Sequence, residues 1–284
     1  IPLLYAVTVA PPKPSKKSWF KWSQSQRAQK KLFNLLDCIV TNNEPLLDFV
    51  REAGITTRVE IIPNGVNPQR FYPADDQQQR QTIRDKLGIA ASDIMITTVG
   101  GIMPRKGSHL LLEAWAQLAV EFPHVHLVLV GPRKDLEQPG LKNFRNQLTK
   151  TISTSGAPER VHFTGLCKNV EEYQRASDIF VLPSEREGMP NSVLEAMASR
   201  VAVIVTPFKG LSHDLGTPGT HFLLCDRNVT DLASALRLLL ENPAQRSQFA
   251  TQGYQWIREN MNIERSLDRY AALYHELAAT HKTV

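Results

Sequence analysis

Residues 178–192 decide the fold of this chain, and they read Asp178-Ile179-Phe180-Val181-Leu182-Pro183-Ser184-Glu185-Arg186-Glu187-Gly188-Met189-Pro190-Asn191-Ser192. The apolar run at 178–182 is short and bounded by turn formers, as in a strand buried on both faces of a parallel sheet. Pro190 suits the first position of a helix, whose exposed backbone amides favour an anion. The stretch therefore predicts strand, loop and helix, with the loop at the carboxyl edge of the sheet, where open α/β folds bind ligands.

Similar runs recur on both sides of this stretch, separated by segments with helical periodicity. The further strands predicted from them span residues 94–99, 125–130, 161–164, 201–206 and 221–224. Between two of them, Leu111, Trp115 and Leu118 fall on one apolar stripe of a helix. This alternation predicts an α/β domain of Rossmann-like type.

The first part of the chain is typical of the end of another α/β unit. Strands are predicted at 3–9, 38–41 and 59–62, and helices at 24–36 and 45–53. We therefore divide the chain into a partial first domain at 1–75, a polar linker at 76–92, a larger domain at 93–262, and a helix at 263–284 that returns to the first domain.

Composition restricts the class of protein. The 284 residues are 42% hydrophobic and 21% charged, which excludes disordered and fibrous chains. No apolar run reaches the length of a membrane span. The three cysteines are odd in number and lie outside any Cys-x-x-Cys pattern, so neither a disulfide framework nor a zinc knuckle is predicted. A reducing, cytoplasmic location is the interpretation that fits best.

The net charge of +5 is concentrated near the start of the chain. A basic and aromatic segment there contains Lys16, Lys17, Trp19, Phe20, Lys21 and Trp22. Such a segment suits docking on an anionic membrane surface, which would make the protein peripheral on the membrane. A solvated loop whose aromatic rings pack on the first domain is the open alternative. Nucleic acid is not predicted as a partner, because no recognised binding motif accompanies the charge.

A second loop of chemical interest follows the strand at 94–99. It reads Val99-Gly100-Gly101-Ile102-Met103-Pro104-Arg105-Lys106-Gly107. Its glycines let the backbone approach a ligand closely, and Arg105 with Lys106 offers positive charge for a diphosphate. It is neither a P-loop nor Gly-x-Gly-x-x-Gly. By itself it is also compatible with a plain glycine turn, just as Glu187 and Glu195 are compatible with a helix cap and a solvated helical residue.

Taken together, the motifs resemble the donor-binding domain of retaining glycosyltransferases of the GT-B fold, specifically glycosyltransferase family 4. The resemblance rests on Val-Gly-x-x-x-Pro-x-Lys-Gly at 99–107, Val-Leu-Val-Gly-Pro at 128–132, Val-His-Phe-Thr-Gly at 161–165, and the block with Glu187 and Glu195 at 183–198. The stretch 59–67 with Phe71 resembles the crossing from the acceptor domain into the linker. These motifs cover most of the chain.

The resemblance implies a role for each matched residue. Glu187 would bind donor-sugar hydroxyls, Lys106 with Arg105 the diphosphate, and Glu195 the ribose. The remaining donor-binding positions would be Gly100, Gly101, Gly165, Leu166, Gly188, Met189, Asn191 and Ser192. No cofactor or metal is expected, since the chain lacks Asp-x-Asp and the donor would be a UDP-sugar or a GDP-sugar.

Three positions depart from the family pattern. The arginine that usually follows the first glycine of the phosphate loop is here Gly101, for which Arg105 would substitute. Thr8 or Val9 stands where the first domain often has a histidine, and the usual Gly-Gly turn is replaced by Thr206-Pro207.

The resemblance implies a retaining, metal-independent hexosyltransferase that transfers a sugar to a glycan or lipid-linked acceptor in polysaccharide, lipopolysaccharide or glycolipid synthesis. A catalytically silent nucleotide-sugar-binding module and a GT-B-like epimerase stay open as alternatives. The chain begins at Ile1 without a methionine. By resemblance, the acceptor domain lacks its first part, so the activity of this piece alone is an open question.

Overall fold

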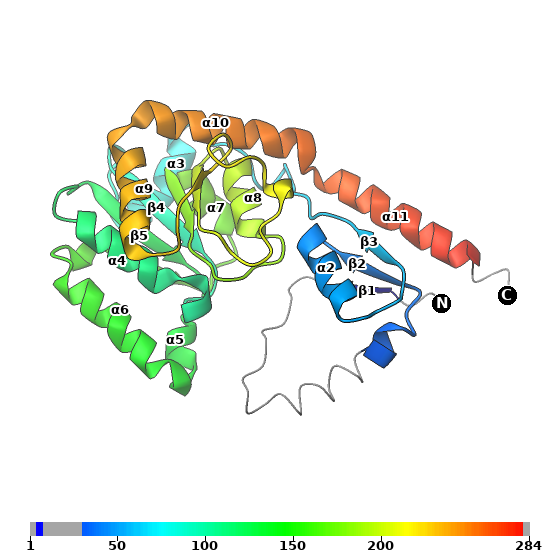
Figure 1. The fold of residues 1–284 in the computed structure, drawn as a ribbon. Coiled ribbons are helices and arrows are strands. Elements are labelled where there is room, and N and C mark those ends of the chain that lie inside the picture. The colour runs from blue at the N-terminus through cyan, green and yellow to red at the C-terminus, as the bar shows by residue number, and fades with distance from the viewer. Residues whose placement is uncertain (1–3, 8–29, 281–284) are drawn as a thin grey trace.

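A computed structural model describes residues 4–7 and 30–280, which form two parallel sheets (Figure 1). The smaller sheet contains β1 (Leu4–Val7), β2 (Cys38–Thr41) and β3 (Val59–Ile61), in that order. The larger sheet has the order β6-β5-β4-β7-β8-β9, with β4 (Ile94–Val99), β5 (Val125–Val130), β6 (Val161–Gly165), β7 (Ile179–Leu182), β8 (Ala202–Val205) and β9 (Leu223–Leu224).

The strand order of the larger sheet fixes where a ligand can bind. Strands β4, β5 and β6 are added outward in one direction, and β7, β8 and β9 in the other. This is the order of a Rossmann sheet, and the reversal lies between β4 and β7, which pair directly. The predicted Rossmann-like class is confirmed, and a crevice is expected outside the carboxyl ends of these two strands.

Helices cover both faces of the larger sheet. On one face lie α4 (Ser108–Leu118), α6 (Lys142–Thr154) and α9 (Val229–Glu241), and on the other α3 (Gln77–Leu87), α7 (Val170–Ala176), α8 (Asn191–Ala198) and α10 (Pro243–Asn260). Short helical turns occupy α5 (Lys134–Glu137), η2 (Pro104–Lys106), η3 (Pro139–Leu141), η4 (Pro158–Arg160) and η5 (His213–Leu215). Alternate residues of each strand therefore face different helices, which explains why the strands are mostly apolar on both faces.

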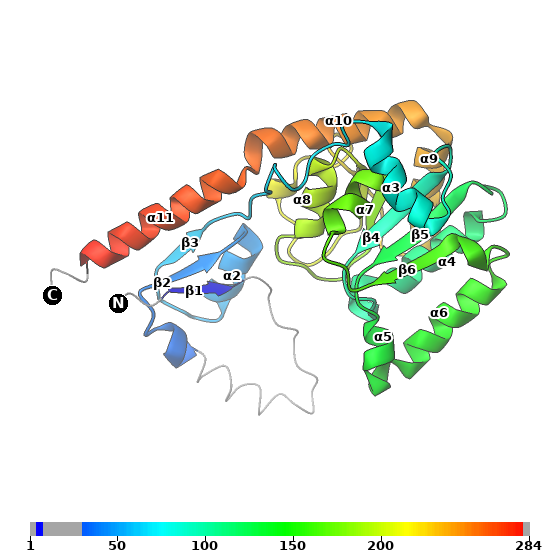
Figure 2. The same cartoon turned by 180° about the vertical axis from the view of Figure 1, so that it is seen from behind.

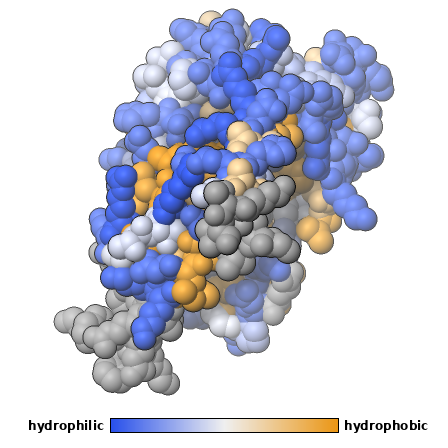
Figure 3. Space-filling view, turned by 90° about the vertical axis from the view of Figure 1, so that its right-hand side faces the viewer, coloured by the Kyte–Doolittle hydropathy of each residue, from blue (hydrophilic) through white to orange (hydrophobic). Residues whose placement is uncertain are grey.

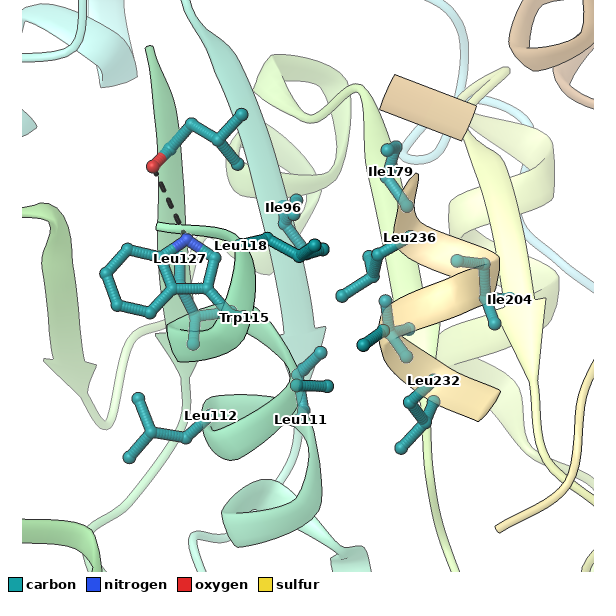
Figure 4. Packing of buried hydrophobic residues seen from close by; sticks show 14 of the residues in the cluster. Ile96, Leu111, Leu112, Trp115, Leu118, Leu127, Ile179, Ile204, Leu232 and Leu236 are labelled. Carbon is teal, nitrogen blue, oxygen red and sulfur yellow. Dashed lines mark hydrogen bonds between the residues drawn. The ribbon is translucent and has the colours of Figure 1, made fainter. Parts of the chain in front are cut away.

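Trp115 of α4 lies at the centre of the first face. The side chain is fully buried, and its indole Nε1 donates a hydrogen bond of 3.4 Å to the carbonyl of Val125 (Figure 4). Leu232 and Leu236 of α9 contribute to the same cluster from the neighbouring helix. The predicted apolar stripe of α4 is thus the face that packs on the sheet.

Helix α3 occupies the polar stretch that composition alone marks as a linker at 76–92. The side chain of Asp76 caps it by accepting from the amide of Gln79 at 2.8 Å, and Gly88 ends it in the left-handed conformation. Ile83 and Arg84 are the residues that it buries. Since one of these two is charged, the helix lacks the apolar stripe that would reveal it in the sequence.

Arg84 is 2% exposed and attaches α3 to the start of β7. Its guanidinium donates to the carbonyls of Ala176, Ala90 and Asp93 at 3.0, 3.1 and 2.8 Å, and to Asp178 Oδ2 at 2.5 Å. Asp178 Oδ1 also accepts from Arg80 at 2.6 Å. The buried guanidinium of Arg84 is therefore well satisfied, which is the condition under which a buried charge is tolerated.

The chain passes between the two sheets twice, first near Val66 and again near Asn262, and these two segments lie side by side. Val66 pairs with Asn262 in parallel, and the amide of Val66 donates to the carbonyl of Met261 at 2.8 Å. A Cβ on Gly65 would lie 2.2 Å from the Cα of Ile263, so only glycine fits where the crossings touch.

Helix α11 (Ile263–Thr280) then runs along the smaller sheet, which α2 (Glu44–Glu52) flanks on its other side (Figure 1). Leu273 and Leu277 pack with Cys38 and Val40 of β2. Arg58 and Glu276 form an ion pair at 2.5 Å between the strand end and the helix.

The basic and aromatic segment predicted from Lys16 to Trp22 lies outside the described residues, as does part of the predicted helix at 24–36. Within the described ranges, we find no helix long and apolar enough to cross a membrane. The face of the molecule on the side of the smaller sheet and α11 is mostly hydrophilic, with small hydrophobic patches (Figure 3).

Arg84→Met is expected to lower the free energy of unfolding by about 3–5 kcal/mol, because it removes the guanidinium donor from the carbonyls of Ala176 and Asp93 and from Asp178, whereas the carbonyl of Ala90 keeps the amide of Asp93 as a donor. Arg80→Met is the matched control, since Arg80 contacts the same carboxylate from a side chain that is 36% exposed. It should cost under about 1 kcal/mol. Urea unfolding followed by circular dichroism measures both, and equal losses would contradict the role given to Arg84.

Candidate active site

The loops that follow β4 and β7 touch each other through their backbones. Gly107 has φ 71°, and a Cβ there would lie 2.0 Å from the carbonyl oxygen of Pro183. The amide of Glu185 donates to the carbonyl of Arg105 at 2.9 Å. The two motifs selected from the sequence are thus held together at the point where the strand order reverses.

Glu187 lies at the centre of this contact and is buried. Its Oε1 accepts from Lys106 Nζ and from Ser184 Oγ, both at 2.6 Å. Arg105 lies 3.7 Å from the same oxygen and donates to the carbonyl of Arg186 at 2.5 Å. Among the described residues, none donates to Oε2. One oxygen therefore fixes the carboxylate, and the other is left to accept from a ligand.

The glycines of the first loop bring its backbone close to Lys106. Gly100 has φ 145°, and a Cβ there would lie 3.4 Å from Lys106 Cε. A Cβ on Gly101 would lie 3.3 Å from the Cγ of Lys134. Lys134 thus reaches the loop from the end of β5, a position that the sequence analysis did not select. Its place two residues after Gly131-Pro132 at the same sheet edge is the signal that could have found it.

The second loop passes into the amino-terminal end of α8. Gly188 and Met189 are buried there, and the N-cap residue, Pro190, makes no side-chain capping hydrogen bond. Asn191 accepts a hydrogen bond of 2.7 Å on its Oδ1 from Asn64, which lies just before the first crossing of the chain. The carbonyl of Ser192 accepts from Gln174 of α7 at 3.2 Å. The amides of Asn191 and Val193 already donate to the carbonyls of Met189 and Pro190 at 3.0 and 2.9 Å, whereas the amide of Ser192 has no acceptor among the described residues and is available to an anion.

Glu195 lies one turn further along α8 and differs from Glu187 in its surroundings. Burial raises the pKa of Glu195 to about 7, the charge of Arg70 lowers it, and that of Glu171 raises it. In the described part of the chain its carboxylate has no hydrogen-bond or ion-pair partner. A carboxyl held near neutrality in this way is typical of a functional site.

Arg70 is a second residue that the sequence analysis did not select. It donates to Glu171 at 2.9 Å and to the carbonyl of Lys168 at 3.0 Å, and so joins the first crossing to the loop after β6. Gly165 has φ 67° with open space beside it, and Leu166 is 84% exposed, both at the carboxyl end of β6. No contact among the described residues joins them to Lys106 or Glu187.

Metal-ligating side chains are dispersed. In residues 4–7 and 30–280, no three His, Cys, Asp or Glu side chains lie together in a way that could hold a metal ion.

Comparison with known proteins supports a common family. The model of the family described as glycosyl transferases group 1 matches residues 79–256. Mannosylfructose-phosphate synthase of Agrobacterium fabrum is 28% identical over 201 residues, which are 69% of this chain and 43% of that protein. The lipopolysaccharide core biosynthesis glycosyltransferase LpsE of Rhizobium meliloti is 27% identical over 242 residues, which are 85% and 65% of the two chains. This chain therefore spans less than two thirds of either relative.

Among solved structures, Alr3699/HepE of Anabaena in complex with UDP superimposes with a TM-score of 0.81. The match covers 97% of this chain and 72% of that one at 20% identity, which supports the fold alone. The family match extends over more than half of the chain, from α3 to α10, and includes both loops of the site. On this evidence the chain belongs to the group 1 family of glycosyl transferases and has the GT-B fold.

Proposed function

We propose that the crevice between β4 and β7 is the donor site of a retaining, metal-independent hexosyltransferase. The full protein would transfer a hexose or related sugar from a nucleoside-diphosphate sugar to a glycan or lipid-linked acceptor. The observation that carries this proposal is the Lys106–Glu187 pair, which lies 2.6 Å apart where two loops from different strands meet.

The diphosphate would bind beside Lys106 and Arg105, facing the uncapped end of α8. When the bond to the sugar breaks, negative charge accumulates on the departing diphosphate. A lysine, an arginine and backbone amides that are already in place stabilise this charge without reorganising. Arg105 would take the place of the arginine that the family usually has at the position of Gly101. Lys134 is a further cation close to the same loop.

The donor sugar and the ribose would each be bound by one carboxylate of the protein. Glu187 would accept sugar hydroxyls on Oε2, while the bonds from Lys106 and Ser184 to Oε1 hold the group in one orientation. Glu195 would accept the ribose hydroxyls, and these bonds would replace the water that burial has removed from it. Gly165 and Leu166 would lie near the base.

The relatives support the nature of the two substrates. HepE of Anabaena was solved with UDP, which supports a UDP-sugar, with a GDP-sugar as the alternative donor. LpsE acts in lipopolysaccharide core synthesis, which supports a glycan acceptor at a cell surface. Synthesis of this kind would place the protein in the cytoplasm, and docking on an anionic membrane through Lys16 to Trp22 remains a prediction. A nucleotide-sugar epimerase would instead release an isomerised sugar without any acceptor.

Lys106→Ala is expected to lower the transfer rate about a hundredfold or more, because it removes a charge aimed at the leaving diphosphate. The assay uses the full-length protein and whichever UDP-sugar or GDP-sugar most raises its melting temperature. Lys86→Ala, at an exposed position of α3, is the matched control and should retain the wild-type rate. An unchanged rate in Lys106→Ala would contradict the proposal, and sugar isomerised without an acceptor would identify the epimerase.

Nucleotide binding is expected to weaken as the pH falls from 8 to 6. With a pKa of about 7, the ionised fraction of Glu195 drops from about 90% to about 10%, and the affinity should fall about tenfold with it. Glu195→Gln removes this titration, so its affinity should be low at both pH values. Calorimetry with the same nucleotide on both proteins measures the difference, which also cancels any titration of the nucleotide itself. Parallel pH profiles would contradict the assignment of Glu195.

The same substitution is expected to stabilise the ligand-free protein. When folding raises the pKa of a carboxyl, the folded protein loses stability as the pH rises from the pKa of the unfolded chain, 4.5, through that of the folded protein, about 7. Glu195→Gln avoids this cost and should gain about 1–3 kcal/mol at pH 8 but little at pH 5. Thermal unfolding at the two pH values measures the gain, and a loss of stability at pH 8 would contradict the burial of a charged Glu195.

A further inference from the structure

A second cavity lies at the opposite edge of the larger sheet, beside the amino-terminal end of β7. Its volume is about 350 Å³, and four arginines from separate elements line it. They are Arg80 of α3, Arg175 of α7, Arg200 just after α8, and Arg246 of α10. Figure 2 shows these helices on one side of the sheet, with α10 along the top. We call this feature the arginine cavity.

The positive charge of the arginine cavity is largely uncompensated. Asp178 is the acidic residue that lines it, and both of its oxygens already bind arginine, Oδ1 from Arg80 and Oδ2 from Arg84. Within the described ranges, no Asp or Glu lies within 4 Å of the guanidinium groups of Arg175, Arg200 or Arg246.

The three unpaired arginines are nevertheless held in place by neutral groups. Arg175 donates to the carbonyl of Arg70 at 2.9 Å and stacks on Tyr72 at 4.4 Å. Arg246 donates to the carbonyl of Leu239 at 2.6 Å, and Arg200 to Thr251 Oγ1 at 3.1 Å. Each guanidinium is thus positioned but keeps further N–H donors for a ligand.

Two further observations indicate that this grouping is costly to the free protein. Burial lowers the pKa of Arg246; the charge of Asp178 raises it and that of Arg80 lowers it. Arg200 has φ 57° at the end of α8, a left-handed position that normally takes glycine or asparagine. Strain of this kind persists chiefly where it serves a function.

We propose that the arginine cavity binds a phosphate dianion carried by a phosphomonoester or a diphosphate. The planar guanidinium fork matches phosphate oxygens in pairs, and three unneutralised arginines suit a ligand with at least two negative charges. The amino-terminal end of α10, at Pro243, adds a favourable dipole. The volume exceeds that of one phosphate group, so the rest of a small molecule or a lipid headgroup can enter with it. This site is separate from the donor site, which lies at the other end of β7.

Calorimetric titration with inorganic pyrophosphate tests the proposal in a Lys106→Ala background, which weakens binding at the donor site. Adding R200Q and R246Q is expected to lower pyrophosphate affinity about tenfold or more at this second site. Adding R51Q and R145Q removes two charges from other surfaces and is the matched control, which should leave binding unchanged. Arg200→Glu alone, at an exposed position, provides a second variant with little risk to folding, and it should weaken binding in the same way.

Vesicles of phosphatidylcholine with and without phosphatidic acid distinguish the two sources of the phosphate. Sedimentation with phosphatidic acid that is lost in R200Q/R246Q identifies a lipid headgroup. Pyrophosphate binding without such sedimentation identifies a free phosphorylated ligand. Failure of both probes to bind, or equal binding by the cavity variants and the control, would overturn the proposal and leave the arginines as caps for carbonyl groups.

Discussion

The carbonyl oxygen of Pro183 lies where a side chain on residue 107 would begin, and the candidate site depends on this close approach. Parallel strands β4 and β7 deliver their loops to the same edge of the sheet, but adjacency alone does not bring side chains into contact. The missing Cβ of Gly107 lets one backbone rest on the other. Lys106 and Glu187, 81 positions apart in the chain, then meet at hydrogen-bond distance.

Three carboxylates along β7 and α8 illustrate how partners decide what an acid can do. Asp178, before the strand, is saturated by two arginines and an amide, so it serves as an anchor. Glu187, after the strand, is held by one oxygen and open at the other. Glu195 is partly buried and has no hydrogen-bond or ion-pair partner among the described residues, and its desolvation raises its pKa to about 7. From Asp178 to Glu187 to Glu195, more of the hydrogen-bonding capacity of the carboxylate is left unused. The role of the carboxylate changes accordingly from structural support to ligand binding.

Much of the sheet could be predicted from sequence, because strands buried on both faces are short apolar runs between turns. Predicted strands 94–99 and 125–130 coincide with β4 and β5, whereas the run at 221–224 shortens to two residues in the edge strand β9. Helix α3 was missed because its buried face contains an arginine.

The site was predictable as a pair of loops but not as a set of contacts. The motifs at 99–107 and 183–198 follow predicted parallel strands, so the sequence places Lys106 and Glu187 at one edge of the sheet. The two hydrogen bonds to Glu187 Oε1 depend on tertiary packing, which the sequence does not show. Arg70 and Lys134 come from other parts of the chain, outside these two motifs. The place of Lys134 after Gly131-Pro132 is a weak sequence signal for that residue, whereas the involvement of Arg70 follows from the tertiary fold alone.

Val66 pairs with Asn262, so the two ends of the segment that contains the larger sheet, residues 66–262, lie side by side. In terms of topology, residues 66–262 are an insertion between β3 and α11 of a smaller, discontinuous unit. The last helix supplies Leu273 and Leu277 to the core built on β2, while the cores of the larger body end with Met261. A chain that ended after residue 262 would therefore keep the cores of the larger domain. It would lose the helix that completes the core of the smaller, first-translated unit.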